Sequence, residues 1–163
     1  MLSYAQVDLE DSIFSVSEVI NGVLKGAHII IFEKEEIKID ISIRDNIQLT
    51  GKRKFLEDVL SNLISNSRKA LTNEKDKIIS CESYVDGDKL TIIFSDNGHG
   101  VDYNIQDKMF EMFKTTTAEE GGAGLGLFIA RSRMKALNGT IDLIPSVFAP
   151  KGASFRLIIP LKK

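Results

Sequence analysis

Three clusters of residues have the types and spacing that binding of a phosphate-bearing ligand requires. In the first, Asn62, Asn66 and Lys69 follow one another at i, i+4 and i+7, so they would stack on one side of a helix. Asparagine is unfavourable inside a helix, and a buried amide must find hydrogen-bond partners. Asn66 is therefore either a structural asparagine or a neutral oxygen ligand for Mg²⁺ with Lys69 near phosphate, because Mg²⁺ takes few protein ligands when phosphates are present.

The second cluster is the segment 96–100, with the sequence D-N-G-H-G. By the period of two, Asp96 shares one face of a predicted strand with Ile92 and Phe94. A carboxylate on an apolar face is costly unless it is hydrogen-bonded or paired. An ionised carboxylate accepts hydrogen bonds and does not donate them. Asp96 could therefore recognise the exocyclic amine of adenine, or it could cap the turn before glycine.

The third cluster is the glycine-rich run 121–126, which leads into a predicted helix. Glycines at a helix start expose backbone N–H groups and the positive end of the helix dipole, which suits phosphate oxygens. The run is not a P-loop, because no lysine follows. It is not a dinucleotide-binding fingerprint either, because the spacing is G-x-G-x-G and no strand leads into it. A flexible loop at a helix start is the alternative.

Composition narrows the kind of protein. A chain of 163 residues suits one domain. The 21 basic and 23 acidic residues give a formal charge of −2, so nucleic acid is not an expected partner. The single cysteine, Cys81, fits a reducing compartment, and no apolar run approaches the ~20 residues of a membrane helix. We expect a cytoplasmic domain without membrane contact, which leaves the membrane attachment of a longer parent protein open.

Helices and strands alternate along the predicted chain. A helix capped by Asp11 or Ser12 comes first, and 29–32 could be helix or strand. A long connection over 101–124, with a short helix near 105–113, has the length of a functional lid. The order predicts an α/β (α+β) two-layer sandwich, with a mixed, mostly antiparallel sheet of about five strands and about three helices on one face. The other predicted elements are strands over 37–43, 77–85, 89–95, 140–144 and 153–159, and helices over 51–71 and 125–137, the latter ending at Asn138-Gly139.

Together the clusters resemble the motifs of a known family, the catalytic ATP-binding domains of sensor histidine kinases. Asn62–Ala70 resembles their asparagine box, Asp96–Val101 their first glycine box, Phe110–Phe113 their phenylalanine box and Gly122–Leu127 their second glycine box. The boxes occur in the family's order, and the resemblance extends over about 7–161. It implies the Bergerat-type fold of the GHKL ATPases, with ATP between the helices and a mobile lid over about 101–124. Residues 1–6 resemble the tail of a preceding dimerisation helix, and 7–163 the catalytic domain.

The resemblance also implies roles for individual residues. Asn66 would be the Mg²⁺ ligand, Asp96 would bind the adenine amine, and the catalytic residues would be Asn62, Asn66 and Lys69. Phe110 and Phe113 would anchor the lid. The full set that would bind ATP is Asn66, Lys69, Asp96, Gly98, Gly100, Val101, Phe110, Phe113, Thr116, Gly122, Gly124, Leu125 and Gly126.

The residue at position 62 bears on whether the phosphate of ATP is transferred to another group or released by hydrolysis. In the hydrolysing relatives a glutamate four residues before the Mg-binding asparagine activates water, whereas the amide of Asn62 cannot act as a general base. This favours transfer of phosphate to another group. Two departures from the family pattern are Ser67, where alanine is usual, and Ala123, where a hydroxyl residue is frequent.

The phosphate acceptor is not evident in this sequence. His28 lies in an apolar stretch without the acidic residue and downstream proline of the family's histidine box, and His99 lies between glycines. We therefore expect a monomeric catalytic portion that delivers the γ-phosphate of Mg-ATP to a histidine on the dimerisation domain of a parent kinase, which then supplies a response regulator. The alternatives are an ATPase of the gyrase or chaperone type, a nucleotide- or partner-binding module without activity, and a related serine kinase.

Overall fold

The computed structural model describes residues 10–111 and 123–161 of the chain. A five-stranded sheet has the order β2-β4-β5-β7-β6. Its β2–β4 pair is parallel, and the pairs β4–β5, β5–β7 and β6–β7 are antiparallel. The predicted mixed, mostly antiparallel sheet is confirmed. Its strands are β2 Lys38–Ile43, β4 Ile78–Asp86, β5 Lys89–Asp96, β6 Thr140–Ile144 and β7 Ala153–Pro160.

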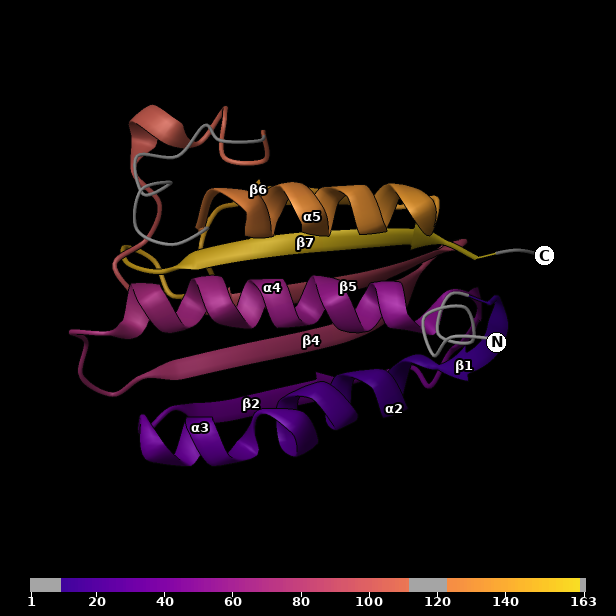
Figure 1. Ribbon diagram of the computed structural model, residues 1–163, viewed down its shortest axis with the longest axis horizontal. Helices are drawn as coiled ribbons and strands as arrows, with labels where there is room; N and C mark the ends of the chain where they lie inside the picture. The colour runs from indigo at the N-terminus through magenta and orange to yellow at the C-terminus, as the bar shows by residue number, and fades with distance from the viewer. Residues whose placement is uncertain (1–9, 112–122, 162–163) are drawn as a thin grey trace, which may run out of the picture.

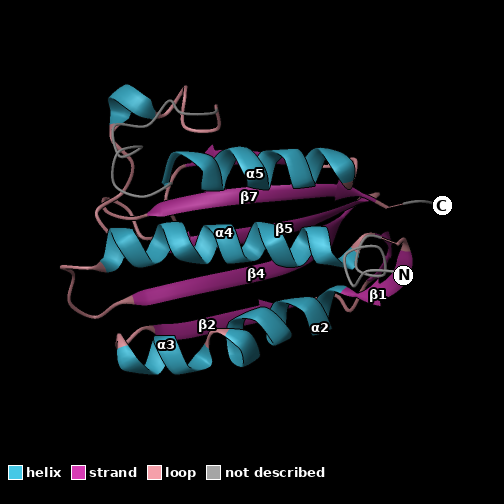
Figure 2. Ribbon diagram, in the orientation of Figure 1, coloured by secondary structure: helices cyan, strands magenta, loops and turns pink. Residues whose placement is uncertain are grey.

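The helices lie together on one face of this sheet (Figures 1 and 2). The predicted two-layer sandwich is thereby confirmed. In both views α4 lies beside α5 on one side and beside the N-terminal helical segment on the other. The helical elements are α2 Val16–Asn21, the π-helix η1 Gly22–Ala27, α3 Ile29–Lys34, α4 Arg53–Leu71 and α5 Ala123–Ala136.

Helix α4 contains the whole asparagine box, Asn62–Ala70. Its buried residues recur at helical spacing and include Leu56, Val59 and Leu63, each 0% exposed, so the helix is held by one apolar face rather than by propensity. Ser67 is fully buried on this helix, whereas Ala70 is half-buried. The buried face of α4 packs on the sheet beneath it and against α5 beside it.

The N-terminal prediction is wrong about the first element. Residues Ser12–Ser15 form strand β1, and the helix begins at Val16, with the Ser15 hydroxyl accepting a hydrogen bond from the Glu18 amide at 3.2 Å. Strand β1 pairs with β3, Gln48–Gly51, which the sequence did not predict. Phe14 of β1 opposes Leu49 of β3, and both are buried. This pairing joins segments far apart in sequence, so no local pattern indicated it.

The segment 29–32, left open between helix and strand, belongs to α3. Gly22 and Gly26 both fall in η1. The helical stretch thus continues through them with a wider turn.

The short helix predicted near 105–113 is wrong in its described part. A 3₁₀ turn, η2 Tyr103–Ile105, is followed by turns up to Phe110. The remainder of the predicted lid, including Phe113, Thr116 and Gly122, lies outside the described residues. Helix α5 begins at Ala123, two residues before the prediction, and its predicted end is confirmed: Asn138 has φ 61° and the Gly139 amide bonds the Met134 carbonyl at 2.8 Å.

Across the described residues, no helix combines the length and apolar character that crossing a membrane requires.

Candidate functional site

A buried carboxylate lies at the end of β5, in the middle of the sheet. Asp96 is 1% exposed. Its Oδ1 accepts a hydrogen bond from the Gly98 amide at 2.9 Å, and its Oδ2 accepts one from the Ser67 hydroxyl at 2.7 Å. Burial raises the pKa of Asp96. These two hydrogen bonds oppose that rise, as do the nearby His99 and a backbone hydrogen bond from Ala153. The donors therefore favour the ionised form, which only accepts hydrogen bonds.

The loop after Asp96 is closely packed against the C-terminal end of α4. A Cβ on Gly98 would lie 2.6 Å from the Ala70 carbonyl oxygen, and the His99 amide bonds that same oxygen at 3.2 Å. Gly100 has φ +86°, a conformation that favours glycine. The glycines of this box are therefore needed for contacts within the protein itself, in addition to any approach of a ligand.

Asn97 is a residue of the site that the sequence analysis did not single out. Its Oδ1 accepts from the Ile78 amide at 2.8 Å, and its Nδ2 donates to the Asp76 carbonyl at 2.8 Å. It thus ties the loop to the start of β4. The signal was present in the sequence, since asparagine before glycine often bonds nearby backbone in a turn.

Asn62 of α4 lies near the first turn of α5. Asn62 and Asn66 are half-buried, and Lys69 is exposed. The Asn62 Nδ2 donates to the Asp58 carbonyl at 2.9 Å, and its Oδ1 lies 3.4 Å from the position that a Cβ on Gly126 would occupy. The amide of Asn62 therefore spans the gap between the two helices.

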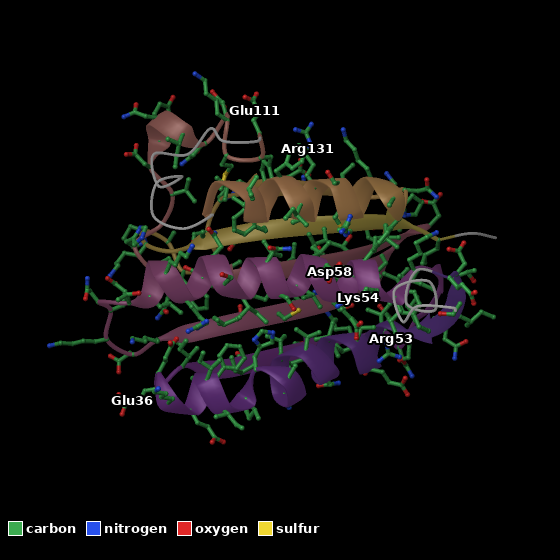
Figure 3. All side chains as sticks on the ribbon, in the orientation of Figure 1. Glu36, Arg53, Lys54, Asp58, Glu111 and Arg131 are labelled. Atoms are coloured by element: carbon green, nitrogen blue, oxygen red, sulfur yellow. The ribbon has the colours of Figure 1, made fainter. Side chains whose placement is uncertain are left out.

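Helix α5 runs antiparallel to α4, since Gly126 lies beside Asn62 while Arg133 reaches Asp58 nearer the start of α4. The Arg133 Nε donates to the Asp58 Oδ2 at 3.2 Å. Lys54, which Figure 3 labels beside Asp58 on α4, lies 3.3 Å from the other carboxylate oxygen. The Arg133–Asp58 ion pair links the two helices away from the Asp96 end, whereas the Lys54–Asp58 pair lies within α4. The start of α5 is thereby placed beside the second half of α4.

The glycine-rich run enters the helix earlier than predicted. Gly124 lies in the first turn of α5 rather than before the helix, and Leu125 and Gly126 lie within the helix, as predicted. The first N–H groups of a helix have no partner within it, and they carry the positive end of its dipole. The first turn of α5 therefore offers anion-binding groups on the same side as Asn62.

The start of the predicted lid is anchored on the sheet. The ring of Phe110 packs edge-on against Phe155 of β7, with centroids 6.2 Å apart and planes at 88°. Met109 beside it is 2% exposed, and Val101 is half-buried against the core. Up to this point the segment 101–111 is attached to the domain by apolar contacts.

Of the two histidines, His28 lies apart from these groups, whereas His99 belongs to the loop after Asp96. His28 lies between α3 and α4, 3.4 Å from the Ser61 hydroxyl and beside the Phe32 ring. Burial lowers the pKa of His28, and the nearby Arg68 lowers it further. His99 is exposed in the loop after β5.

No group of three His, Cys, Asp or Glu side chains within the described ranges could hold a metal ion. Among the candidate site residues of α4, the side-chain oxygens are those of the neutral amides of Asn62 and Asn66. Such a donor set fits Mg²⁺ that is bound mainly by phosphates and water, because Mg²⁺ retains several waters and needs few protein ligands there.

The geometry brings a buried hydrogen-bond acceptor and a helix N-terminus to the same end of the domain. The acceptor suits an amine, and the helix N-terminus suits phosphate. One molecule with both groups, separated by a linker, is an adenine nucleotide.

Comparison with known proteins also indicates a protein that binds an adenine nucleotide. Residues 51–163 match the family model described as "Histidine kinase-, DNA gyrase B-, and HSP90-like ATPase". The match covers more than half of the chain, so the chain belongs to this family of ATPases.

Curated relatives in the family are sensor kinases. The C4-dicarboxylate transport sensor protein DctB of Rhizobium meliloti (strain 1021) is 34% identical over 131 residues, which are 79% of this chain and 20% of DctB. The signal transduction histidine-protein kinase AtoS of Escherichia coli (strain K12) is 33% identical over 113 residues, 69% of this chain and 18% of AtoS. The chain thus spans about a fifth of the length of the curated relatives it matches.

Solved structures share the fold. The catalytic domain of histidine kinase ThkA has a TM-score of 0.80 at 24% identity and covers 93% of this chain and 95% of its own. The mycobacterial sensor histidine kinase MprB has a TM-score of 0.76 at 19% identity, with 91% and 97% covered. With the family match, these likenesses define an ATP-binding catalytic domain of the sensor histidine kinase type, a component of two-component signalling.

Proposed function

We propose that this domain binds Mg-ATP between α4, the loop after β5 and the start of α5, and delivers the γ-phosphate to a histidine on the dimerisation domain of a parent kinase. The observation that carries the proposal is the buried Asp96 carboxylate, which accepts hydrogen bonds from Ser67 of α4 and from Gly98. A buried carboxylate with spare acceptor capacity is costly unless a donor reaches it. The amine of adenine is such a donor.

The two ends of the nucleotide would contact different elements. Asp96 would accept the adenine amine, with Gly98, Gly100 and Val101 forming the loop beside the base. Lys69 would contact phosphate, and Asn66 would hold the ion through its side-chain oxygen. Bound Mg²⁺ would supply charge neutralisation on the phosphate oxygens. The contacts proposed for the segment before and at the start of α5 are those of Phe110, Phe113, Thr116, Gly122, Gly124, Leu125 and Gly126.

Transfer is favoured over hydrolysis by the chemistry at position 62. The Asn62 amide bonds its own helix through Nδ2, and it has no group that could remove a proton from water. Phosphoryl transfer depends mainly on positioning and charge stabilisation. The domain would therefore hold ATP in place until an acceptor histidine reaches the γ-phosphate.

The acceptor would belong to another domain. His28 is half-buried between two helices, with a lowered pKa, and His99 is in the loop after Asp96. Neither position supports a role as the phosphorylated group of this domain. The related histidine kinase ThkA has been solved in complex with the response regulator protein TrrA, at 22% identity and a TM-score of 0.77. By analogy, a response regulator would receive the phosphate downstream, and the domain would act in the cytoplasm as a monomer.

The test is a calorimetric titration of ATP into the chain with and without Mg²⁺. We expect saturable binding that Mg²⁺ strengthens, without continuing heat. Asn66→Ala should remove most of the strengthening by Mg²⁺. Asn21→Ala should not, although Asn21 is also a half-buried helical asparagine. Continuing heat would indicate a hydrolysing ATPase, and absence of binding would refute the proposal.

A further inference from the structure

Ser67 lies within the proposed nucleotide site but is not one of the residues proposed to contact ATP. It follows Asn66 in α4 and is 0% exposed. Its hydroxyl donates to the Oδ2 of Asp96 at 2.7 Å, across 29 positions in sequence. A serine within a helix commonly bonds the backbone of the preceding turn. Here the hydroxyl is instead directed at a carboxylate on the sheet.

A buried serine does not by itself acquire such a partner in this fold. Ser83 of β4 is also 0% exposed, yet its Oγ has no hydrogen-bond partner in the described part of the chain. Burying a hydroxyl without a hydrogen bond is unfavourable. The Ser67–Asp96 contact is therefore a specific interaction between α4 and β5, and Ser83 is a natural reference for a serine that only packs.

The contact constrains the carboxylate of Asp96 from a second direction. The torsion that orients an aspartate carboxylate is broad when nothing restrains it. In this structure the Gly98 amide holds Oδ1 and the Ser67 hydroxyl holds Oδ2. An ionised carboxylate has about four lone-pair sites, so it can still accept a further donor. A backbone hydrogen bond from Ala153 also reaches this carboxylate. The bonds from Gly98, Ser67 and Ala153 together set the orientation of the remaining acceptor.

We propose that Ser67 is a positioning residue for base recognition, which orients Asp96 so that the site selects purines carrying a 6-amino group. The inference rests on the proposed function, because it concerns the same nucleotide site. It goes further by assigning the selectivity to a pair of residues. Ser67 acts through Asp96, so its effect depends on the presence of the amine on the ligand.

The experiment compares two nucleotides that differ only in this group. ATP and purine riboside triphosphate, which lacks the 6-amino group, are titrated into the full chain with Mg²⁺. Ser67→Ala should weaken ATP binding about fivefold, the loss expected for one hydrogen bond. It should change binding of purine riboside triphosphate much less. Ser83→Ala is the matched control, and it should change neither affinity.

Folding of the variant is checked by thermal melting, and we expect it to fold because alanine is the residue most favoured in helices. In an Asp96→Asn background, Ser67→Ala should no longer affect ATP binding selectively. Equal losses for both nucleotides, or no loss for ATP, would overturn the inference while leaving the proposed function in place. Absence of ATP binding by the unmodified chain would overturn both.

Discussion

Replacing Asp96 with asparagine changes the chemistry of the site while almost preserving its shape. The Gly98 amide requires an acceptor at Oδ1, so the amide oxygen of the new side chain takes that position. The new NH₂ group then takes the position of Oδ2 beside Ser67. A hydrogen-bond donor thus stands where the carboxylate presented an acceptor, and it opposes the adenine amine.

The expected loss follows from the hydrogen bond that disappears. A bond to a charged partner contributes about 1.5–3 kcal/mol, and each 1.4 kcal/mol is a factor of ten in affinity. We therefore expect Asp96→Asn to weaken Mg-ATP binding about 10- to 150-fold. Binding of GTP, whose base carries a carbonyl at the corresponding position, should weaken less or improve.

Calorimetric titration with ATP and GTP measures both effects. Asp142→Asn is the matched control, because Asp142 forms an ion pair with Arg156 on β6–β7 with about half of its side chain exposed. It should leave both affinities unchanged. If Asp96→Asn bound ATP as tightly as the unmodified chain, Asp96 would not be the residue that recognises the base.

The same substitution should also remove a dependence of stability and ATP affinity on pH. Burial raises the pKa of Asp96 in the folded protein, so the folded state binds this proton more tightly than the unfolded state does. The contribution of Asp96 to the free energy of unfolding therefore becomes more favourable as the pH falls towards the raised pKa. ATP affinity should fall in that same window, because the protonated carboxyl loses its negative charge. Asp96→Asn should lack both effects, and comparison of the two proteins cancels the titration of the phosphates.

Three further predictions concern neighbouring positions. Asn62→Glu should raise steady phosphate release from ATP at least ~100-fold relative to Asn62→Gln, because it adds a general base; equal rates would refute the assignment of this position. Gly98→Ala should lower the unfolding free energy by about 1–3 kcal/mol in urea denaturation, because its Cβ would lie 2.6 Å from the Ala70 oxygen, whereas Gly22→Ala, with open space around it, should not. Glu35→Gln should cost about 0.2–1 kcal/mol at neutral pH, and the difference should vanish as the pH falls through the lowered pKa of Glu35; a difference that persists in acid would contradict this.

Local patterns were sufficient where one element determines its own structure. The apolar spacing within the predicted helix 51–71 predicted α4, and Asn138-Gly139 predicted the end of α5. The alternation along β5 predicted that Asp96 would be buried. Each of these features depends on residues within one or two helical turns or on one strand, so it can be read from the sequence.

Contacts between distant segments were decided by the tertiary structure. The pairing of β1 with β3 depends on apolar residues that meet only in the folded chain. The first turn of α5 holds Gly126 beside Asn62 because the two helices run antiparallel. Gly98 packs against Ala70, a contact that the resemblance, which implied only that Gly98 binds ATP, did not indicate.

Ser67 illustrates the difference between what the sequence determined and what the tertiary structure decided. Its position beside Asn66 was evident in the sequence, where it counted as a small departure from the family pattern. Its full burial and its hydrogen bond to Asp96 depend on how far α4 is rotated over the sheet. By itself, the sequence determined which chemical groups are available and which helices and strands carry them. Only the tertiary structure decided which of those groups touch, because that depends on the packing of α4 against β5 and α5.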